Sequence, residues 1–301
     1  LPPEGALAAL GRPGGGSAAS MPLLQVRDLT VRFGAKEVVR SVNFSIAQGE
    51  KLALVGESGS GKTITALSLL RLAGDAKISG QAMLRGRDLL SLSEREMRGI
   101  RGGEIAMVFQ EPMTALNPLM TIGQQIAEVL ELKRALTTVQ SAQAAIELLA
   151  KTGIPEPERR ANSFPHQLSG GQRQRAMIAM ALASEPALLL ADEPTTALDV
   201  TLRGQILDLL SDLQRSSGMA VLLITHDLNL VRRFADRVAV MEQGVLVEQG
   251  RVADVFGAPQ HDYTRRLIAS QPRRDVVEAA PPAGTAPVVQ AQGVRVVYPT
   301  P

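Results

Sequence analysis

Hydrophobic and polar positions alternate in the first part of the chain. Leu23–Phe33 alternates apolar and polar residues, a pattern typical of an edge strand. Val42–Ile46 has the same character, and Gln48-Gly49-Glu50 follows it as a turn. We therefore predict that these two segments form an antiparallel pair.

Further along, short apolar runs alternate with segments of helical periodicity. The apolar runs have the length of strands: Lys51–Val55, Ile105–Phe109, Ala187–Ala191 and Ala220–Thr225. Helical spacing of apolar residues marks the segments between them: Thr63–Leu72, Ala176–Ala183, Leu202–Gln214 and Leu228–Phe234. Continuous apolar strands suit parallel strands that helices cover on both faces. This alternation predicts a mostly parallel α/β core.

Two more segments complete the predicted α/β fold. Met113–Thr152 carries helical periodicity and few strand formers, so the region of about 111–168 is predicted to be an inserted helical subdomain. Val238–Met241 and Val245–Val247 flank Gln243-Gly244 and predict a closing hairpin. The expected architecture is a mostly parallel core sheet, an antiparallel β edge subdomain and the helical insertion.

The two ends of the chain differ from the middle in composition. Residues 1–20 are rich in Ala, Gly and Pro and are predicted to be a disordered leader. Residues 21–274 are expected to fold as one domain, and residues 275–289 to form a linker. Residues 290–301 echo the first strand about 265 residues later and predict the start of a truncated second domain, with chance similarity as the alternative.

Composition narrows the class of the protein. The 301 residues are 45% hydrophobic and 21% charged, which excludes a collagen, a coiled coil or a wholly disordered chain. The chain has no cysteine, so disulfides, thiolate zinc sites and Cys-ligated iron–sulfur clusters are excluded. A net charge of +2 gives no support for nucleic-acid binding. No apolar run reaches the roughly 18 residues of a membrane span.

A glycine-rich loop between a predicted strand and a predicted helix carries the clearest chemical signal. Residues 56–63 match the phosphate-binding pattern G-x-x-x-x-G-K-[ST] in full. The predicted ATP-binding residues are the members of this loop: Gly56, Glu57, Ser58, Gly59, Ser60, Gly61, Lys62 and Thr63. Inward backbone N–H groups and the positive end of the helix bind phosphate, the lysine reaches the β- and γ-phosphates, and the threonine ligates Mg²⁺. A plain glycine turn is the alternative, which the strand–loop–helix context disfavours.

Two carboxylates end a later apolar strand. Asp192 and Glu193 follow Leu188–Ala191 directly. The carboxyl end of a parallel strand faces the ligand crevice of an α/β sheet. We predict that Asp192 holds Mg²⁺ through water and that Glu193 polarises the attacking water. The alternative is that Asp192 is a helix N-cap with a solvated neighbour.

Further motifs carry a resemblance to a known family. Residues 168–175 read Leu-Ser-Gly-Gly-Gln-Arg-Gln-Arg and resemble the signature motif of ATP-binding cassette (ABC) ATPases. The phosphate loop, Gln110, this signature, the Asp192-Glu193 pair, Asp199 and His226 stand in that family's order. The resemblance covers about residues 23–274 and implies that residues 21–274 form an ABC nucleotide-binding domain with the P-loop ABC ATPase fold.

The resemblance implies roles for residues that single motifs leave open. Gln110 corresponds to the Q-loop glutamine, near Mg²⁺ or the lytic water, and His226 to the H-loop residue that contacts the γ-phosphate. Asp199 corresponds to the D-loop at the cassette–cassette interface, and Phe33 to an aromatic stacked on adenine. Taken alone, Gln110 is better explained as a surface residue at a strand end and His226 as a structural histidine. Phe33 is equally well explained as a strand residue.

The signature has a physical reason of its own. Ser169, Gly170, Gly171 and Gln172 stand at the start of a predicted helix, which makes a second anion-binding helix end. In the family, the signature of one cassette closes in trans over ATP held by another. A simple helix cap explains Ser169 but not the glycine pair.

Two stretches resemble one branch of the family. Residues 110–118 read Gln-Glu-Pro-Met-Thr-Ala-Leu-Asn-Pro, and the tail contains His261-Asp262-Tyr263-Thr264-Arg265-Arg266-Leu267. Both resemble oligopeptide, dipeptide and nickel importers, although Asp262 replaces the usual proline. The chain looks most like the N-terminal cassette of the tandem ATPase of microcin C and peptide importers. This implies an ATP-hydrolysing importer subunit for peptides or peptide-like solutes.

The resemblance also implies ligands, partners and a location. ATP and Mg²⁺ are the expected cofactors, with Thr63, Gln110 and Asp192 around the metal. The expected partners are two permease subunits, a second cassette from the same full-length chain or a second copy, and indirectly a solute-binding protein, with no nucleic acid. The expected location is the cytoplasmic face of the bacterial inner membrane. A soluble ABC ATPase and a small-molecule kinase are the alternatives; the importer-like stretches disfavour the first, and the signature and Glu193 the second.

Overall fold

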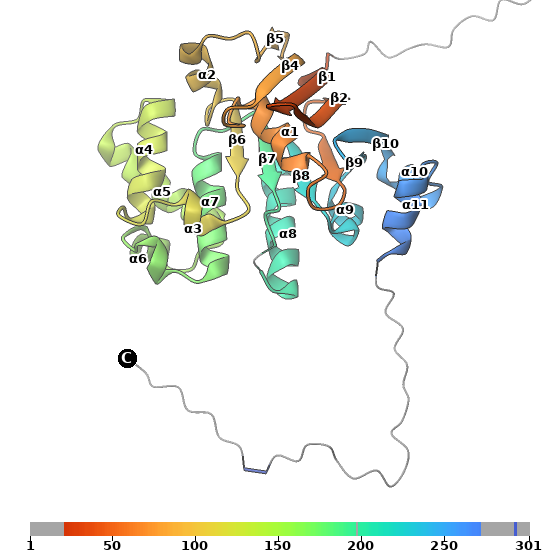
Figure 1. The fold of residues 1–301 in the computed structure, drawn as a ribbon. Coiled ribbons are helices and arrows are strands. Elements are labelled where there is room, and N and C mark those ends of the chain that lie inside the picture. Colours follow the sequence, from red (N-terminus) through yellow and green to blue (C-terminus); the bar gives the residue numbers. More distant parts are fainter. Residues whose placement is uncertain (1–20, 197, 272–291, 294–301) are drawn as a thin grey trace, which may run out of the picture. The chain divides into compact units, whose positions relative to one another are not determined.

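The computed structural model describes residues 21–196, 198–271 and 292–293 (Figure 1). Residues 1–269 form one compact unit and residues 270–301 a second, and every helix and strand described below belongs to the first. The predicted leader (1–20) and linker (275–289) lie outside the described residues, as do all but two residues of the predicted second domain (290–301).

An antiparallel sheet forms one layer of the molecule. Its strands, in spatial order, are β2 (Lys36–Ile46), β1 (Leu24–Phe33), β4 (Lys77–Leu84) and β5 (Arg87–Asp88). The predicted pairing of the first two segments is confirmed, with Leu24 opposite Ile46. The sequence patterns did not predict β4 and β5, which extend the sheet on the other side of β1.

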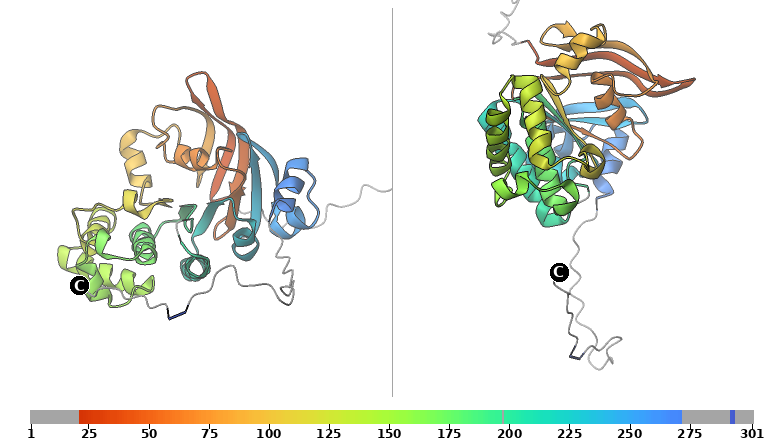
Figure 2. Two further views of the ribbon diagram at one scale, coloured as in Figure 1. Left: turned by 60° about the horizontal axis from the view of Figure 1, so that its bottom comes forward. Right: turned by 90° about the vertical axis from the view of Figure 1, so that its left-hand side faces the viewer.

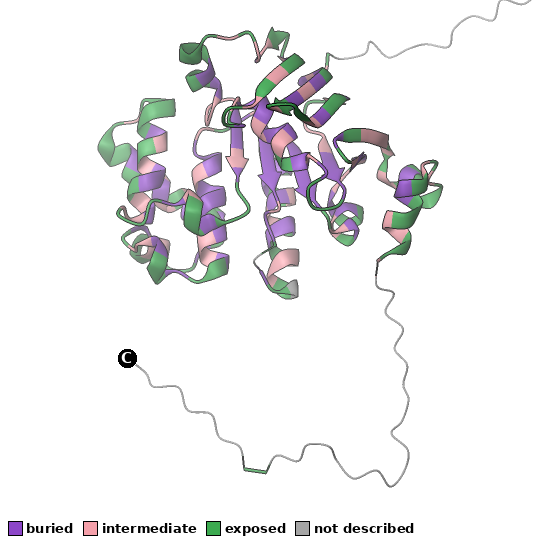
Figure 3. Ribbon diagram, viewed as in Figure 1, coloured by how far each residue is buried: buried purple, intermediate pink, exposed green. Residues whose placement is uncertain are grey.

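The second sheet is mostly parallel, as predicted. Its strands, in spatial order, are β10 (Val245–Arg251), β9 (Arg237–Glu242), β3 (Lys51–Val55), β8 (Ala220–Thr225), β7 (Leu188–Asp192) and β6 (Ile105–Val108). Only the β9–β10 hairpin is antiparallel among these pairs. Every residue of β7 and β8 is buried, which explains why these strands read as continuous apolar runs (Figure 3).

Alternate residues of one strand serve two different cores. Leu188 and Leu190 pack into the cluster shared with the antiparallel sheet and α1 (Lys62–Leu69). Leu189, between them, packs on the opposite face with helices α7 (Gly170–Leu182) and α8 (Val200–Ser217). The other helices outside the insertion between β6 and α7 are α2 (Glu94–Ile100), α9 (Leu228–Phe234), α10 (Val252–Gly257) and α11 (Asp262–Ala269). The period-two side-chain alternation of a strand thus joins two apolar layers.

The predicted helical subdomain is present between β6 and α7. It contains four α-helices and one 3₁₀ turn: α3 (Pro112–Ala115), α4 (Ile122–Arg134), α5 (Thr138–Lys151), α6 (Pro157–Ala161) and Pro165–Gln167. Thr121 and Thr137 begin α4 and α5 with capping boxes. Leu130, Leu149 and their neighbours form a core separate from those of the sheets, and Figure 2 shows the helices grouped at one side of the parallel sheet.

Several predicted bounds need correction. The apolar pattern at Ala176–Ala183 marks only the second part of a helix that spans Gly170–Leu182, whose start at Ser169 the signature motif indicates. Phe109 lies after β6 and is exposed, so the strand ends at Val108. The α2 helix was not predicted, although Ser93 and Glu96 form a capping box at its start. Within the described ranges, none of the helices combines the length and apolar character that a membrane crossing needs.

Substitutions on one helix should separate packing from exposure. Ile126 is 0% exposed in the core of the helical subdomain, whereas Leu132 on the same helix is 74% exposed. Ile126→Ala is expected to lower the free energy of unfolding by about 2–5 kcal/mol, because it leaves a cavity. Leu132→Ala should change it by less than about 0.5 kcal/mol. Chemical denaturation of both variants tests this, and equal losses would contradict the assigned core.

Candidate nucleotide site

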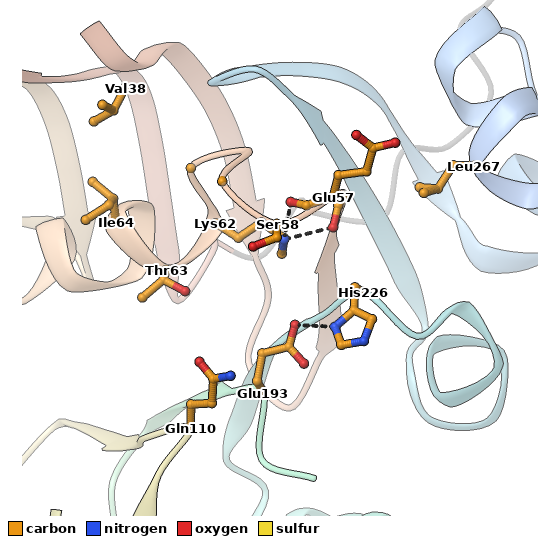
Figure 4. Close-up of a pocket in the computed structure, with 13 residues that line it drawn as sticks. Val38, Glu57, Ser58, Lys62, Thr63, Ile64, Gln110, Glu193, His226 and Leu267 are labelled. Carbon is orange, nitrogen blue, oxygen red and sulfur yellow. Dashed lines mark hydrogen bonds and ion pairs between the residues drawn. The ribbon is translucent and has the colours of Figure 1, made fainter. Parts of the chain in front are cut away.

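The carboxyl ends of four neighbouring parallel strands, β3, β8, β7 and β6, meet at one edge of the sheet. A pocket of about 590 Å³ lies there (Figure 4). Its lining residues are Val38, Gly56, Glu57, Ser58, Gly59, Gly61, Lys62, Thr63, Ile64, Gln110, Glu193, His226 and Leu267. The fold therefore brings together residues that are up to about 230 positions apart in the sequence, at the place where α/β sheets bind ligands.

The phosphate-binding pattern forms a loop whose glycines are needed sterically. Gly56, Gly59 and Gly61 have φ values of 152°, 80° and 100°. A Cβ atom on Gly56 would lie 2.1 Å from the carbonyl oxygen of Met241. A Cβ on Gly61 would lie 2.8 Å from the carbonyl oxygen of Val38. The loop therefore packs against the backbone of β2 and β9 so closely that only glycine fits at these two positions.

Lys62 is buried inside this loop. The residue is only 6% exposed. Its Nζ donates hydrogen bonds to the carbonyl oxygens of Gly56 and Glu57, each at 2.8 Å. Burial lowers the pKa of Lys62, while the carboxylates of Glu193 and Asp192 oppose that shift. The ammonium group is thus held by backbone dipoles at the place where the loop would receive an anion.

Thr63, which lines the pocket, is hydrogen-bonded to the buried Asp192. Thr63 Oγ1 donates to Asp192 Oδ1 at 3.0 Å. Burial raises the pKa of Asp192, the neighbouring Glu193 raises it further, and the Thr63 hydroxyl and Lys62 lower it. Asp192 is the last residue of β7, so the alternative that it caps a helix is wrong.

Glu193 is held by two side chains in a backbone conformation that favours glycine. Its φ is 46°. Oε1 lies 2.8 Å from Nδ1 of His226, and Oε2 accepts a hydrogen bond from Thr196 at 2.7 Å. The Glu193 side chain is 12% exposed and that of His226 59%, and Figure 4 shows both facing the pocket. The carboxylate is therefore oriented and yet remains open to the pocket.

Of the two other residues predicted to contact the nucleotide, Gln110 lines the pocket and Phe33 does not. Gln110 follows β6 and lines the pocket, and its side chain lies near Glu193 in Figure 4. Phe33 ends β1 and packs, half-buried, against the core shared by the two sheets. It is not among the residues that line the pocket, where Val38 and Ile64 supply apolar surface instead.

The signature residues lie outside this pocket. Ser169 caps α7: its Oγ accepts from the Gln172 N–H at 3.3 Å, and its own N–H donates to Gln172 Oε1 at 3.1 Å. Gly171 packs against Leu202, where a Cβ would lie 3.3 Å from that side chain, while Gly170 is exposed. Asp199 caps α8 by accepting from the Leu202 N–H at 2.9 Å. Within this chain, these residues therefore start helices and do not touch the phosphate loop.

Sequence patterns missed three kinds of residue at the site. Val38 and Ile64 look like ordinary strand and helix residues, and nothing local marks them as pocket-lining. Thr196 stands three positions after Glu193, and its role depends on the turn between them. Leu267 belongs to the tail stretch that the sequence singled out as a branch marker, but the fold alone brings it to the pocket.

The fold and this pocket define a P-loop nucleotide-binding protein of the ATP-binding cassette class. Residues 39–196 match the ABC transporter family, and the chain belongs to that family. The predicted resemblance to ABC ATPases and the predicted fold class are therefore confirmed.

Related proteins agree with this assignment. The chain is 53% identical over 290 residues to the peptidoglycan transport ATP-binding protein YejF of Agrobacterium fabrum, an alignment that covers 93% of this chain and 52% of that protein. It thus spans about half the length of this relative. The oligopeptide transport ATP-binding protein OppD of Bacillus subtilis is 50% identical over 258 residues, covering 83% of this chain and 72% of OppD.

Solved structures share the fold. A dimeric structure of the ATP-binding cassette MJ0796, in a post-hydrolysis state with ADP and Pi, superposes with a TM-score of 0.68 at 31% identity. That match covers 76% of this chain and 98% of the other. The cbiO1 protein of Clostridium perfringens, part of the ABC transporter complex cbiONQ, gives a TM-score of 0.69 at 28% identity, with 79% and 91% of the two chains covered.

Two glycine substitutions should distinguish steric exclusion from backbone strain in the loop. Gly56→Ala combines a positive φ with a Cβ 2.1 Å from a carbonyl oxygen, whereas Gly59→Ala has a positive φ and open space. Gly59→Ala is expected to cost about 1–2 kcal/mol of unfolding free energy, and Gly56→Ala at least about 1–3 kcal/mol more. Denaturant titration of both variants measures the difference. Equal losses would show that the contact with Met241 does not constrain the loop.

Proposed function

We propose that this chain binds ATP in the pocket at the carboxyl edge of the parallel sheet and hydrolyses it. The observation that carries the proposal is the convergence of the phosphate loop, Glu193 and Gln110 on one pocket, with Asp192 hydrogen-bonded to the lining residue Thr63. The buried Lys62, the glycine-rich loop and the N-terminus of α1 supply an anion site. The carboxylate of Glu193, oriented by His226, faces the same pocket. Phosphoryl transfer to water needs these elements and little covalent chemistry from the protein.

The position of each residue in the pocket indicates its role in the proposed hydrolysis. Lys62 exchanges its two carbonyl contacts for phosphate oxygens, so the charge is already desolvated when ATP arrives. Glu193 takes a proton from the attacking water as general base. His226, hydrogen-bonded to Glu193 and exposed towards the pocket, orients that carboxylate and is placed to reach the γ-phosphate. Thr196 holds the other oxygen of Glu193.

The donor set beside the loop suits Mg²⁺. Thr63 Oγ1 and Asp192 Oδ1 are oxygen donors 3.0 Å apart, and Gln110 lines the same pocket. Mg²⁺ typically takes one or two protein carboxylates together with phosphate oxygens and waters. Among the described residues no cluster of three or more acidic or histidine side chains could hold a metal alone, which fits an ion bound together with nucleotide. When bound, it would neutralise charge that develops on the phosphates.

A second cassette completes the proposed mechanism. Ser169 and Gly170 are exposed at the N-terminus of α7 and do not line the chain's own pocket. On this proposal the signature, residues 169–172, closes over ATP in another cassette through its exposed residues Ser169 and Gly170, with Asp199 at the interface. The second cassette is either another copy of this chain or a further cassette in the same polypeptide. The dimeric ATP-binding cassette that shares this fold supports the arrangement.

The proposed biological role is import of peptides or peptide-like solutes. Relatives at about 50% identity are named for oligopeptide and peptidoglycan transport. On this proposal the cassettes sit at the cytoplasmic face of the membrane, and two permease subunits dock on the helical subdomain near residues 111–119. A solute-binding protein delivers the solute to the permease. The transport names of the relatives favour this role over a soluble ABC ATPase.

Replacement of Glu193 should separate binding from chemistry. Glu193→Gln keeps the shape and a hydrogen-bond acceptor for His226 but removes the base, so turnover is expected to fall by a factor on the order of 10²–10⁴. ATP affinity should stay within about threefold of the unchanged chain. Lys62→Ala is the contrasting variant, which should lose affinity as well as turnover. Binding titrations and phosphate release measure both. Loss of affinity in Glu193→Gln would assign that residue to binding or structure.

Protein concentration should control activity if the signature acts in trans. ATP that bridges two cassettes favours the dimer by mass action, so turnover per molecule is expected to rise with concentration in a hundredfold dilution series. Ser169→Arg should abolish this rise without weakening ATP binding to the monomer. Thr137→Arg is the matched control, because it removes an equivalent capping box and adds the same charge in α5. A flat profile from a monomer confirmed by light scattering would contradict the two-cassette mechanism.

A further inference from the structure

Contacts with the strands β9 and β10 of the parallel sheet position α11, the last helix of the described domain. Glu248 of β10 accepts hydrogen bonds from the backbone N–H groups of Gln260 and His261, at 2.9 and 3.1 Å. Arg266 of α11 forms an ion pair with Glu242 of β9 at 3.4 Å. The position of α11 is therefore set by the hairpin β9–β10, which pairs with β3 just before the phosphate loop.

One side chain of α11 reaches the phosphate loop itself. Tyr263 is 3% exposed, and its phenol oxygen accepts a hydrogen bond from the Glu57 N–H at 3.0 Å. Burial raises the pKa of Tyr263, so the phenol is neutral at physiological pH. The contact joins residues 206 positions apart, and it is a part-buried hydrogen bond, which typically contributes about 0.5–1.5 kcal/mol.

Two hydrogen bonds meet at the peptide bond between Gly56 and Glu57. The N–H of Glu57 and the C=O of Gly56 belong to the same planar amide. Its N–H donates to Tyr263, and its C=O accepts from Lys62 Nζ at 2.8 Å. Tyr263 and Lys62 therefore hold opposite ends of one amide. When Lys62 turns towards a phosphate, the Tyr263 contact is the one that still fixes the orientation of this amide.

A second residue of α11 faces the same place. Leu267 lies one helical turn after Tyr263, a spacing that puts both side chains on one face of the helix. Leu267 lines the pocket, and Figure 4 shows its side chain pointing from α11 towards the loop near Glu57. The face of α11 that carries Tyr263 and Leu267 thus forms a wall of the nucleotide site.

We infer that Tyr263 is a positioning residue for the phosphate loop, and that through it α11 sets how well the loop binds the phosphate chain of ATP. The inference rests on the proposed ATP-binding function and adds to it a control point in the C-terminal helix. Tyr263 does not touch the pocket's reacting groups; it fixes the Gly56–Glu57 amide from behind. Displacement of α11 would release that amide and weaken phosphate binding, without altering Asp192, Glu193 or His226.

Tyr263→Phe tests the contact, because it removes the hydroxyl and keeps the buried ring. ATP is expected to bind three- to tenfold more weakly, which corresponds to about 0.7–1.4 kcal/mol, the usual worth of one hydrogen bond. Inorganic tripolyphosphate, measured by competition with a fluorescent ATP analogue, should weaken by the same factor because it occupies only the phosphate loop. The thermal unfolding midpoint without nucleotide should stay within about 2 °C of the unchanged chain.

Thr264→Val is the matched control, since it removes the neighbouring buried hydroxyl of α11. It should leave the affinities for ATP and tripolyphosphate within twofold. The inference is overturned if Tyr263→Phe binds both ligands normally, if Thr264→Val loses as much affinity, or if the Tyr263→Phe unfolding midpoint falls together with its affinity. A wild-type chain that binds no ATP would instead refute the proposed function on which the inference depends.

Discussion

The burial of two opposite charges at the carboxyl edge of the parallel sheet is the constraint on which the site depends. Lys62 and Asp192 are both buried, and burial shifts the pKa of each towards its neutral form. Backbone carbonyls must therefore surround the ammonium, and a hydroxyl must meet the carboxylate. This requires a loop that turns back on itself against neighbouring backbone, which is why Gly56 and Gly61 cannot carry a side chain. The loop is thus folded around the charge that would bind an anion.

How far the sequence could predict this depends on the range of the interactions. The parallel strands and the phosphate loop were predictable, because burial on both faces and a glycine-rich turn each leave a local pattern. The strand β4 was not, since only half of its residues are apolar and its pairing with β1 joins residues 45–60 positions apart. The same limit applies to Leu267, whose place in the pocket follows from packing of α11. The roles assigned to Gln110, Asp199 and the signature remain predictions, although the structure fixes where these residues lie.

The signature illustrates how one set of residues serves folding and function together. Ser169 satisfies the first N–H groups of α7, and Gly171 allows the close approach of Leu202. These contacts explain the serine and one glycine within a single chain. Gly170 has only the distant side chain of Leu198, 4.0 Å from where its Cβ would lie, and it is exposed. Gly170, whose glycine identity no contact within the chain explains, thus lies at the surface that the proposed mechanism assigns to a second cassette.

The elements around the pocket differ in what they connect to. Asp192 ends β7, and Glu193 and His226 follow β7 and β8, central strands that pack between two apolar layers. Gln110 follows the edge strand β6 and leads into a helical subdomain with its own separate core. Gln110 therefore connects that subdomain to the pocket, and the Gly56–Glu57 amide connects α11 to the phosphate loop. Two peripheral elements thus reach the same pocket through different residues, while the carboxylate of Glu193 is held by His226 and Thr196.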